Sequence, residues 1–443
     1  MRAVAVLILV ASALGGEPPA LDAAAPTPVA AECIRDGVAL QHTPAVAFGR
    51  KAYLVAWSDG SRMLGKETAD IYCARIEPRT GKALDPQGIA VCRAEGLQER
   101  PAVAFDGTNF LIVWQDLRNG ADYDLYAARV SEEGKVLDPD GFPVSKRASN
   151  QAWPAVAFAA GQYVVAWMDA RQYPVYGIYF ARLSPEGKVL DPDGLPLDAE
   201  DPPKIAKLKP PGETWMGDRD YWWHNLASRT VPSIASNGRV CLVAYEREYP
   251  FAGSGRPAVT VAVVNPSDGS VTKPAKAAGG LSPVWTGKSW ALGGPAWKSG
   301  WTPEPLLGAC ALPETPVEVK EPGATVDVVK AFGGGYNVGK GSTASFPSSA
   351  AFNGHNALVV MQYAWRKKGQ DKSPAFALLA VRVAVEGGFA VLDPKPVVLA
   401  SADAPGFVSH PALAAGPDGE CLLVYEADSD VKRCILEARV VRP

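Results

Sequence analysis

The stretch Pro44-Ala-Val-Ala-Phe48 decides the fold, because it recurs as Pro101-Ala-Val-Ala-Phe105 and as Pro154-Ala-Val-Ala-Phe158. Each copy continues, after a short turn, with an apolar run that ends in tryptophan. These runs are Tyr53-Leu-Val-Ala-Trp57, Phe110-Leu-Ile-Val-Trp114 and Tyr163-Val-Val-Ala-Trp167. The three copies begin 57 and 53 residues apart. Such a repeat is typical of proteins built from stacked or ring-arranged units.

Two more β-favouring runs complete each repeat. The third ends in arginine, as in Leu125-Tyr-Ala-Ala-Arg129, and the fourth follows a Leu-Asp-Pro turn, as in Leu137-Asp-Pro-Asp-Gly141. Four short runs separated by turn residues predict one four-stranded antiparallel blade of a β-propeller per repeat. A helical repeat would need amphipathic runs of about ten or more residues, and the sequence has none.

The repeat continues in weaker form to the end of the chain. Further copies open at Pro232, Leu281, Pro347 and Pro411. The last copy ends with the run Ile435–Val440, which we match to Leu125–Val130, and it lacks a fourth strand.

A spare strand stands at the other end of the chain. Asp36-Gly-Val-Ala-Leu40 resembles the fourth-strand sequence Asp140-Gly-Phe-Pro-Val144. We therefore predict an all-β fold: a single β-propeller of about seven four-stranded blades over residues 32–443. The ring is closed by an N-terminal strand, Ile34–Leu40, that completes the last blade by pairing with Ile435–Val440 and leaves no exposed edge. The alternative is an open array with a capped end, which does not explain the missing and the spare strand.

The repeats resemble those of bacterial secreted and surface β-propeller proteins that are loosely described as WD40-like. The resemblance is specific in the first three repeats, and it implies a propeller. That group of repeats has no shared catalytic residues to transfer, and the Gly-His…Trp-Asp signature of true WD40 repeats is absent.

The N-terminus has the pattern of an export signal. Arg2 precedes the apolar run Ala3–Leu14, and Ala11-Ser12-Ala13 offers a small-residue cleavage site. We expect a signal peptide over residues 1–16, an Ala/Pro-rich linker over 17–31, and a secreted protein that is extracellular, periplasmic or on the cell surface. The alternative is a retained signal that anchors the chain. No later stretch is apolar over a membrane-spanning length.

Charge and cysteine spacing limit the possible partners. The 44 Lys and Arg residues balance 47 Asp and Glu residues, so we expect no nucleic-acid partner. The seven cysteines match no zinc-binding spacing, and we expect no cofactor, no metal and a monomer. Cys73 and Cys92 fall on neighbouring strands and could form a disulfide, whereas Cys421 and Cys434 should lie too far out of register.

Long loops gather on one expected face of the ring, where the inter-blade connections and the loops between second and third strands emerge. The largest is the insertion 198–231. Its aromatic rings, carboxylates and imidazole suit sugar or peptide binding, and an alternative is a lid that buries its own aromatic residues. The candidate ligand-binding residues are Trp215, Asp218, Asp220, Tyr221, Trp222, Trp223 and His224.

Acid–arginine pairs recur where the second strands end. They are Asp59 with Arg62, Asp116 with Arg118, Asp169 with Arg171 and Glu246 with Arg247. Arginines at the channel of sialidase propellers hold a substrate carboxylate, but the sialidase Asp-box is absent here. Because these pairs recur from blade to blade, we expect them to be structural. The Asp-Pro-Asp-Gly turns lack the further ligands of a calcium loop and are better explained as turns.

These observations favour an exported, non-catalytic binding or scaffold propeller whose protein or carbohydrate ligand is unknown. No catalytic arrangement of residues is evident, and we lean away from an enzyme. The alternative is a glycan-active propeller, a glycoside hydrolase or lectin-like protein, that uses Asp218, Asp220 and the neighbouring aromatic residues.

Overall fold

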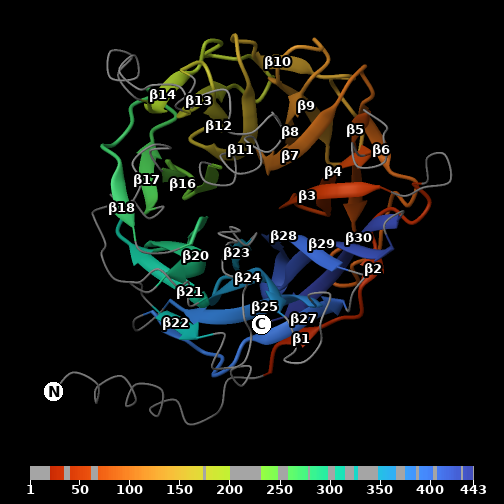
Figure 1. Ribbon diagram of the computed structural model, residues 1–443, viewed down its shortest axis with the longest axis vertical. Helices are drawn as coiled ribbons and strands as arrows, with labels where there is room; N and C mark the ends of the chain where they lie inside the picture. The colour runs from red at the N-terminus through yellow and green to blue at the C-terminus, as the bar shows by residue number, and fades with distance from the viewer. Residues whose placement is uncertain are drawn as a thin grey trace, which may run out of the picture.

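Seven antiparallel sheets form a ring in the computed structural model, each sheet a blade of a β-propeller (Figure 1). The structure describes residues 20–33, 40–60, 68–172, 176–199, 231–247, 258–277, 280–297, 305–314, 324–327, 348–365, 375–385, 389–402, 407–430 and 433–442. The predicted all-β fold of seven blades is confirmed.

The first three blades correspond to the three clear repeats, and each runs through four strands in chain order from the centre outward. Blade 1 is β3 (Gln41–Phe48), β4 (Tyr53–Gly60), β5 (Ala69–Ile76) and β6 (Ile89–Cys92). Blade 2 is β7 (Gln98–Phe105), β8 (Asn109–Asp116), β9 (Asp124–Ser131) and β10 (Phe142–Ser145). Blade 3 is β11 (Gln151–Ala159), β12 (Gln162–Asp169), β13 (Gly177–Leu183) and β14 (Leu195–Asp198).

The weaker repeats form the next three blades with the same order of strands. Blade 4 is β15 (Ser233–Ser236), β16 (Cys241–Arg247), β17 (Ala258–Val264) and β18 (Ala275–Ala277). Blade 5 is β19 (Ser282–Trp285), β20 (Trp290–Trp297), β21 (Pro305–Leu312) and β22 (Ala324–Asp327). Blade 6 is β23 (Ser348–Phe352), β24 (Asn356–Trp365) and β25 (Ala375–Ala384), whose outer edge pairs with both β26 (Ala390–Val391) and β27 (Val397–Ala402).

Both ends of the chain contribute to blade 7, which closes the ring. Its inner strands are β28 (Phe407–Ala415), β29 (Cys421–Asp430) and β30 (Arg433–Arg442), with the 3-10 turn η3 (Pro417–Gly419) between β28 and β29. The outer edge of β30 pairs antiparallel with β1 (Asp22–Ala23) and β2 (Thr27–Pro28). Closure by an N-terminal strand is therefore confirmed.

The closing residues differ from those that the sequence predicted. They come from 22–28, within the stretch expected as a linker, whereas Ile34–Leu40 lies outside the described residues except for Leu40, which makes one parallel bridge to Cys434. The reason lies in Gln41, whose amide donates to the Ala30 carbonyl at 3.0 Å and accepts from the Leu436 N–H at 2.9 Å. Gln41 thereby ties the start of β3 to the preceding segment and to β30.

The third strand of blade 7 is also shifted by one residue from the sequence match. Tyr126 lies opposite Trp114 in blade 2, but Glu437, not Leu436, lies opposite the equivalent Tyr425 in blade 7. A shift of one residue reverses the faces of a strand. Glu437 consequently accepts a hydrogen bond from the Tyr425 hydroxyl at 2.6 Å.

Three tryptophans pack between adjacent blades, as their repeat position predicts. Trp57, Trp114 and Trp167 are all fully buried. Trp114, for example, packs with Leu54 and Ile71 of blade 1. Gly141 of the Asp-Pro-Asp-Gly turn, whose φ angle is 74°, lies against the Trp114 ring. A Cβ at this glycine would come within 2.4 Å of the Trp114 ring, so the turn and the tryptophan fit each other.

The recurring acid–arginine pairs are structural where they are described. Arg118 binds both carboxylate oxygens of Asp116 at 2.9 and 2.7 Å, and it also donates to the Asp140 carbonyl. Asp169 and Arg171 repeat the first arrangement in blade 3. The Arg62 partner expected for Asp59 lies outside the described residues, and the Arg247 side chain is not described.

A second repeated pair joins the third strand to the Leu-Asp-Pro turn. Arg129 holds Asp138 through its backbone N–H and two guanidinium nitrogens, at 3.0, 2.8 and 2.9 Å. Burial alone would raise the pKa of Asp138, but the hydrogen bonds from Arg129 outweigh it and hold that pKa below its ordinary value. This aspartate is used within its own blade, which agrees with a turn rather than a calcium loop.

Cys73 and Cys92 are both buried and form no disulfide with each other, so the predicted pairing is wrong. Cys92 lies opposite Ile71 rather than Cys73. The two cysteines are therefore offset by two residues along the strand direction, which is about 7 Å, as well as by the distance between the two strands. This separation is beyond the reach of a disulfide.

The described part of the chain contains no helix long and apolar enough to span a membrane.

Candidate functional site

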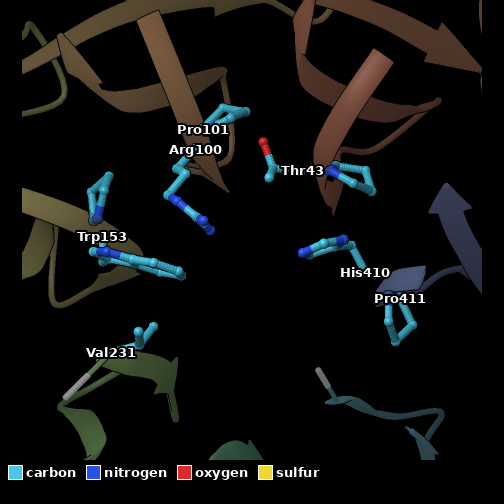
Figure 2. A pocket seen from close by; sticks show the side chains of 9 residues that line it. Thr43, Arg100, Pro101, Trp153, Val231, His410 and Pro411 are labelled. Carbon is cyan, nitrogen blue, oxygen red and sulfur yellow. The ribbon is translucent and has the colours of Figure 1, made fainter. Parts of the chain in front are cut away.

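A pocket of about 190 Å³ opens where the first strands of four blades begin at the centre of the ring (Figure 2). Each of these strands contributes the proline of its repeat and the residue before it. The lining residues are Thr43, Pro44, Arg100, Pro101, Trp153, Pro154, Val231, His410 and Pro411.

The residue before each proline has an unusual backbone. Thr43, Arg100, Trp153 and His410 have φ angles of 49°, 54°, 57° and 47°, in the left-handed region that side chains other than glycine rarely adopt. The strand register shifts at each of them, as at a β-bulge. Such strained residues cost about 1–3 kcal/mol each, and a bulge redirects a side chain. Three of the bulges turn the Arg100, Trp153 and His410 side chains toward the centre of the pocket (Figure 2). The hydroxyl of Thr43 lies 3.1 Å from Ser58 Oγ.

Three of the four strained backbones are held by the preceding blade. The Arg100 N–H donates to Ser58 Oγ at 3.1 Å, and the Trp153 N–H donates to Gln115 Oε1 at 3.1 Å. At the closure of the ring, the Thr43 N–H donates to Glu426 Oε1 at 2.7 Å. The accepting side chain always follows the aromatic residue that ends the second-strand run, so the bulge is part of the scaffold.

The side chains on these four equivalent positions are unlike one another. A hydroxyl, a guanidinium, an indole and an imidazole occupy the same repeat position, while the proline and the run after it are nearly constant. A scaffold that needed one side chain there would repeat it. The repeated bulge therefore presents a set of different chemical groups to the pocket, which we call the channel ring (Thr43, Arg100, Trp153 and His410).

Arg100 is the distinctive member of the channel ring. Its guanidinium carbon lies 3.3 Å from the centre of the Trp153 ring, and among the described residues it makes no ion pair within 4.0 Å. Arg118, Arg129 and Arg171, by contrast, are each paired with an aspartate. Burial lowers the pKa of Arg100 to about 10, against the opposing influence of Glu99, Glu426 and Tyr123. The side chain therefore keeps its charge at neutral pH.

A buried carboxylate supports the other side of the pocket. Glu426 is 3% exposed, and its Oε2 lies 2.7 Å from the Ser409 hydroxyl and 3.0 Å from His410 Nδ1. Burial opposes its ionisation, but the charge and hydrogen bonds of His410 and His42 prevail and hold the pKa of Glu426 well below its usual range. Glu426 thus fixes both the Thr43 backbone and the His410 ring.

The candidate residues predicted from the sequence lie outside the described residues, as does nearly all of the insertion 198–231. Trp215, Asp218, Asp220, Tyr221, Trp222, Trp223 and His224 therefore remain a prediction. Val231, where the insertion ends, lines the pocket.

The channel ring was not predicted from the sequence. The signal was present one residue before each repeat proline, where identity changes from copy to copy although the flanking sequence does not.

No family model and no curated protein matches the chain. Solved structures with a similar arrangement include the polysaccharide lyase Uly1, with a TM-score of 0.49 and 11% identity over 90% of each chain. A protein of unknown function from Dyadobacter fermentans has a TM-score of 0.48 and 10% identity over 96% of this chain and all of that one. The Trypanosoma rangeli sialidase has a TM-score of 0.48 and 7% identity over 95% of this chain and 60% of that chain.

Proposed function

We propose that this chain is a binding propeller that holds a carboxylate-bearing glycan in the central pocket, with Arg100 as the anchor. The observation that carries the proposal is a charged, partly buried guanidinium that makes no ion pair within 4.0 Å among the described residues. A guanidinium presents a planar fork of donors that fits a carboxylate with two parallel hydrogen bonds. A ligand carboxylate would supply the partner that the other arginines find within their own blades.

The neighbours of Arg100 suit an acidic sugar. Trp153 already orients the guanidinium through a cation–π contact, and its indole adds an aromatic surface to the pocket. His410 adds a half-exposed imidazole, and Thr43 adds a lining side chain whose hydroxyl lies 3.1 Å from Ser58 Oγ. This combination of an apolar face with few polar groups is typical of sugar and small-molecule pockets.

Replacing Arg100 with methionine is expected to weaken binding of acidic glycans by roughly 10–100-fold, the effect of losing a charged hydrogen bond worth about 1.5–3 kcal/mol. Methionine keeps the length of the stem and leaves the backbone N–H to Ser58 in place. The measurement is binding of the purified protein to an array of uronate-containing oligosaccharides and their neutral counterparts, followed by titration calorimetry on each hit.

Two controls separate a specific site from general charge. Arg100→Lys keeps the charge without the fork and should lose part of the affinity, whereas Arg93→Gln removes an exposed charge after the outer strand β6 and should lose none. The proposal fails if acidic and neutral glycans bind alike, or if Arg100→Met binds acidic glycans as well as the unchanged chain does.

We further propose that the insertion 198–231 contributes to the same ligand site, since Val231 brings its end to the pocket. Trp222→Ala and Trp223→Ala should then weaken glycan binding and leave the thermal melting temperature nearly unchanged. If the insertion is instead a packed lid, the same variants should melt lower and bind equally well.

A second candidate function is hydrolysis or elimination on the bound glycan, with Asp218 and Asp220 as the acids. The observation that supports this second function is again that Val231, where the insertion 198–231 ends, lines the pocket. Incubating each array hit with the protein and analysing chain length by mass spectrometry tests it. Products shorter than the added glycan that disappear in Asp218→Asn or Asp220→Asn would favour the enzyme over the binding protein.

We also propose that the protein is exported as a monomer after removal of residues 1–16, in keeping with the resemblance of its repeats to bacterial secreted and surface propellers. The support is the charged residue and apolar run at the N-terminus. An extracellular, periplasmic or cell-surface location would bring the pocket to glycans outside the cytoplasm.

A further inference from the structure

A cluster of metal-ligating side chains lies where the two ends of the ring meet. One ligand atom each from His42, Glu426 and Cys434 lies within 4.8 Å of the other two. They come from β3, β29 and β30, on both sides of the junction between blades 1 and 7 (Figure 1). His410, one of only four histidines in the chain, contacts the same carboxylate at 3.0 Å.

The blade scaffold does not require these residue types. The register places Glu99, Ser58 and Ala69 at the equivalent positions between blades 1 and 2. Between blades 2 and 3, the equivalent residues are Ala152, Gln115 and Tyr123. Neither set could hold a soft divalent cation. The imidazole, carboxylate and thiol therefore occur together at one junction out of three that share the same local structure.

The individual side chains also fit a metal site better than a purely structural cluster. Glu426 and Cys434 are each 3% exposed. The buried Nε2 of His42 has no hydrogen-bond partner among the described residues, which is costly for a polar atom. The Cys434 thiol finds only the Gln41 carbonyl, at 3.2 Å.

We propose that His42, Glu426 and Cys434 bind a zinc ion at the junction of blades 1 and 7. Nitrogen, oxygen and sulfur ligands together suit this borderline-soft cation, which accepts three protein ligands and a water. Binding replaces the Cys434 S–H bond with a sulfur–zinc bond, and the thiol proton passes to the solvent. Zinc so placed would join the first and last blades of the ring, in addition to the pairing of β30 with β1 and β2.

The test is a zinc titration of the full chain, prepared without a histidine tag and stripped of metal, in competition with a colorimetric chelator and with no glycan present. We expect one tightly bound zinc ion per chain. Cys434→Ser and His42→Ala should each weaken it by at least the roughly 10–100-fold that even outer-sphere changes cost. Cys241→Ser, a buried cysteine in blade 4, and His355→Ala, an exposed histidine, should leave the affinity unchanged.

Cobalt substitution keeps the proposal testable if a variant folds poorly. The unchanged chain loaded with Co²⁺ should show the near-ultraviolet absorption of a thiolate–cobalt bond, and so should Cys241→Ser, whereas Cys434→Ser should not. The absence of that absorption in the unchanged chain, or zinc affinity that survives both Cys434→Ser and His42→Ala, would overturn the proposal. Because Arg100 is not a ligand, failure here leaves the proposed glycan site standing, and failure of glycan binding leaves this site standing.

Discussion

Replacing Trp114 with alanine should lower the free energy of unfolding by about 3–5 kcal/mol, the cost of a large cavity in a packed interior. The ring is fully buried between blades 1 and 2, and its Nε1–H donates to Asp116 Oδ2 at 2.8 Å. Since domains are stable by only about 5–15 kcal/mol, this change should move the urea denaturation midpoint strongly. A shift no larger than that of an exposed substitution would contradict the packing role.

Phenylalanine at two equivalent positions separates the indole hydrogen bond from the packing. Trp114→Phe removes the donor to the buried Asp116, whereas Trp57→Phe removes an Nε1–H that has no partner among the described residues. The two rings lie at the same place in neighbouring blades. Trp114→Phe should therefore cost more, by about 1 kcal/mol, the usual net value of one hydrogen bond. Equal losses would show that this bond contributes nothing.

The sequence was sufficient for the blades because every copy repeats the same packing problem. Trp57, Trp114 and Trp167 sit at one position of one strand, and a blade must bury that position against its neighbour. The number of blades and the order of strands follow from counting such copies. The paired Asp116 and Arg118 were also recognisable as structural, because they are close in sequence and repeated.

The channel ring could not be predicted in the same way. A residue before proline normally avoids helical backbone conformations, so nothing local indicated that Arg100 and His410 adopt a left-handed one. At Thr43, Arg100 and Trp153 the N–H is held by an acceptor that the preceding blade offers. Such inter-blade hydrogen bonds become visible only when the blades are placed side by side.

Residues that meet at the closure of the ring were beyond sequence reasoning for a related reason. His42 and Cys434 lie near opposite ends of the chain, and no spacing rule for metal ligands covers such a separation. The closing strand was expected at Ile34–Leu40 from its resemblance to a fourth strand. Instead, Gln41 contacts Ala30 near one end of the chain and Leu436 near the other. The strands that pair with the edge of β30 are β1 and β2.

Replacing Arg382 with methionine should lower the free energy of unfolding by about 3–5 kcal/mol, because it leaves the Asp393 carboxylate buried without its counter-charge. The two side chains are only 3% and 7% exposed. The guanidinium lies 2.6 Å from Asp393 Oδ1, and the Arg382 N–H lies 2.6 Å from Oδ2. Arg382 and Asp393 occupy in blade 6 the positions that Arg129 and Asp138 occupy in blade 2, but their side chains are more deeply buried.

The repeat supplies the matched control, since Arg75 and Asp85 form the same pair at 25% and 16% exposure. Water can solvate the carboxylate left by Arg75→Met, so that variant should lose clearly less stability in the same urea titration. Adding Asp393→Asn to Arg382→Met should restore much of the loss, because asparagine carries no charge and its carbonyl can still accept the backbone N–H. If Arg382→Met and Arg75→Met cost the same, burial of the pair has no bearing on its contribution. If the double variant is no more stable than Arg382→Met, the loss comes from packing of the arginine stem rather than from an uncompensated charge.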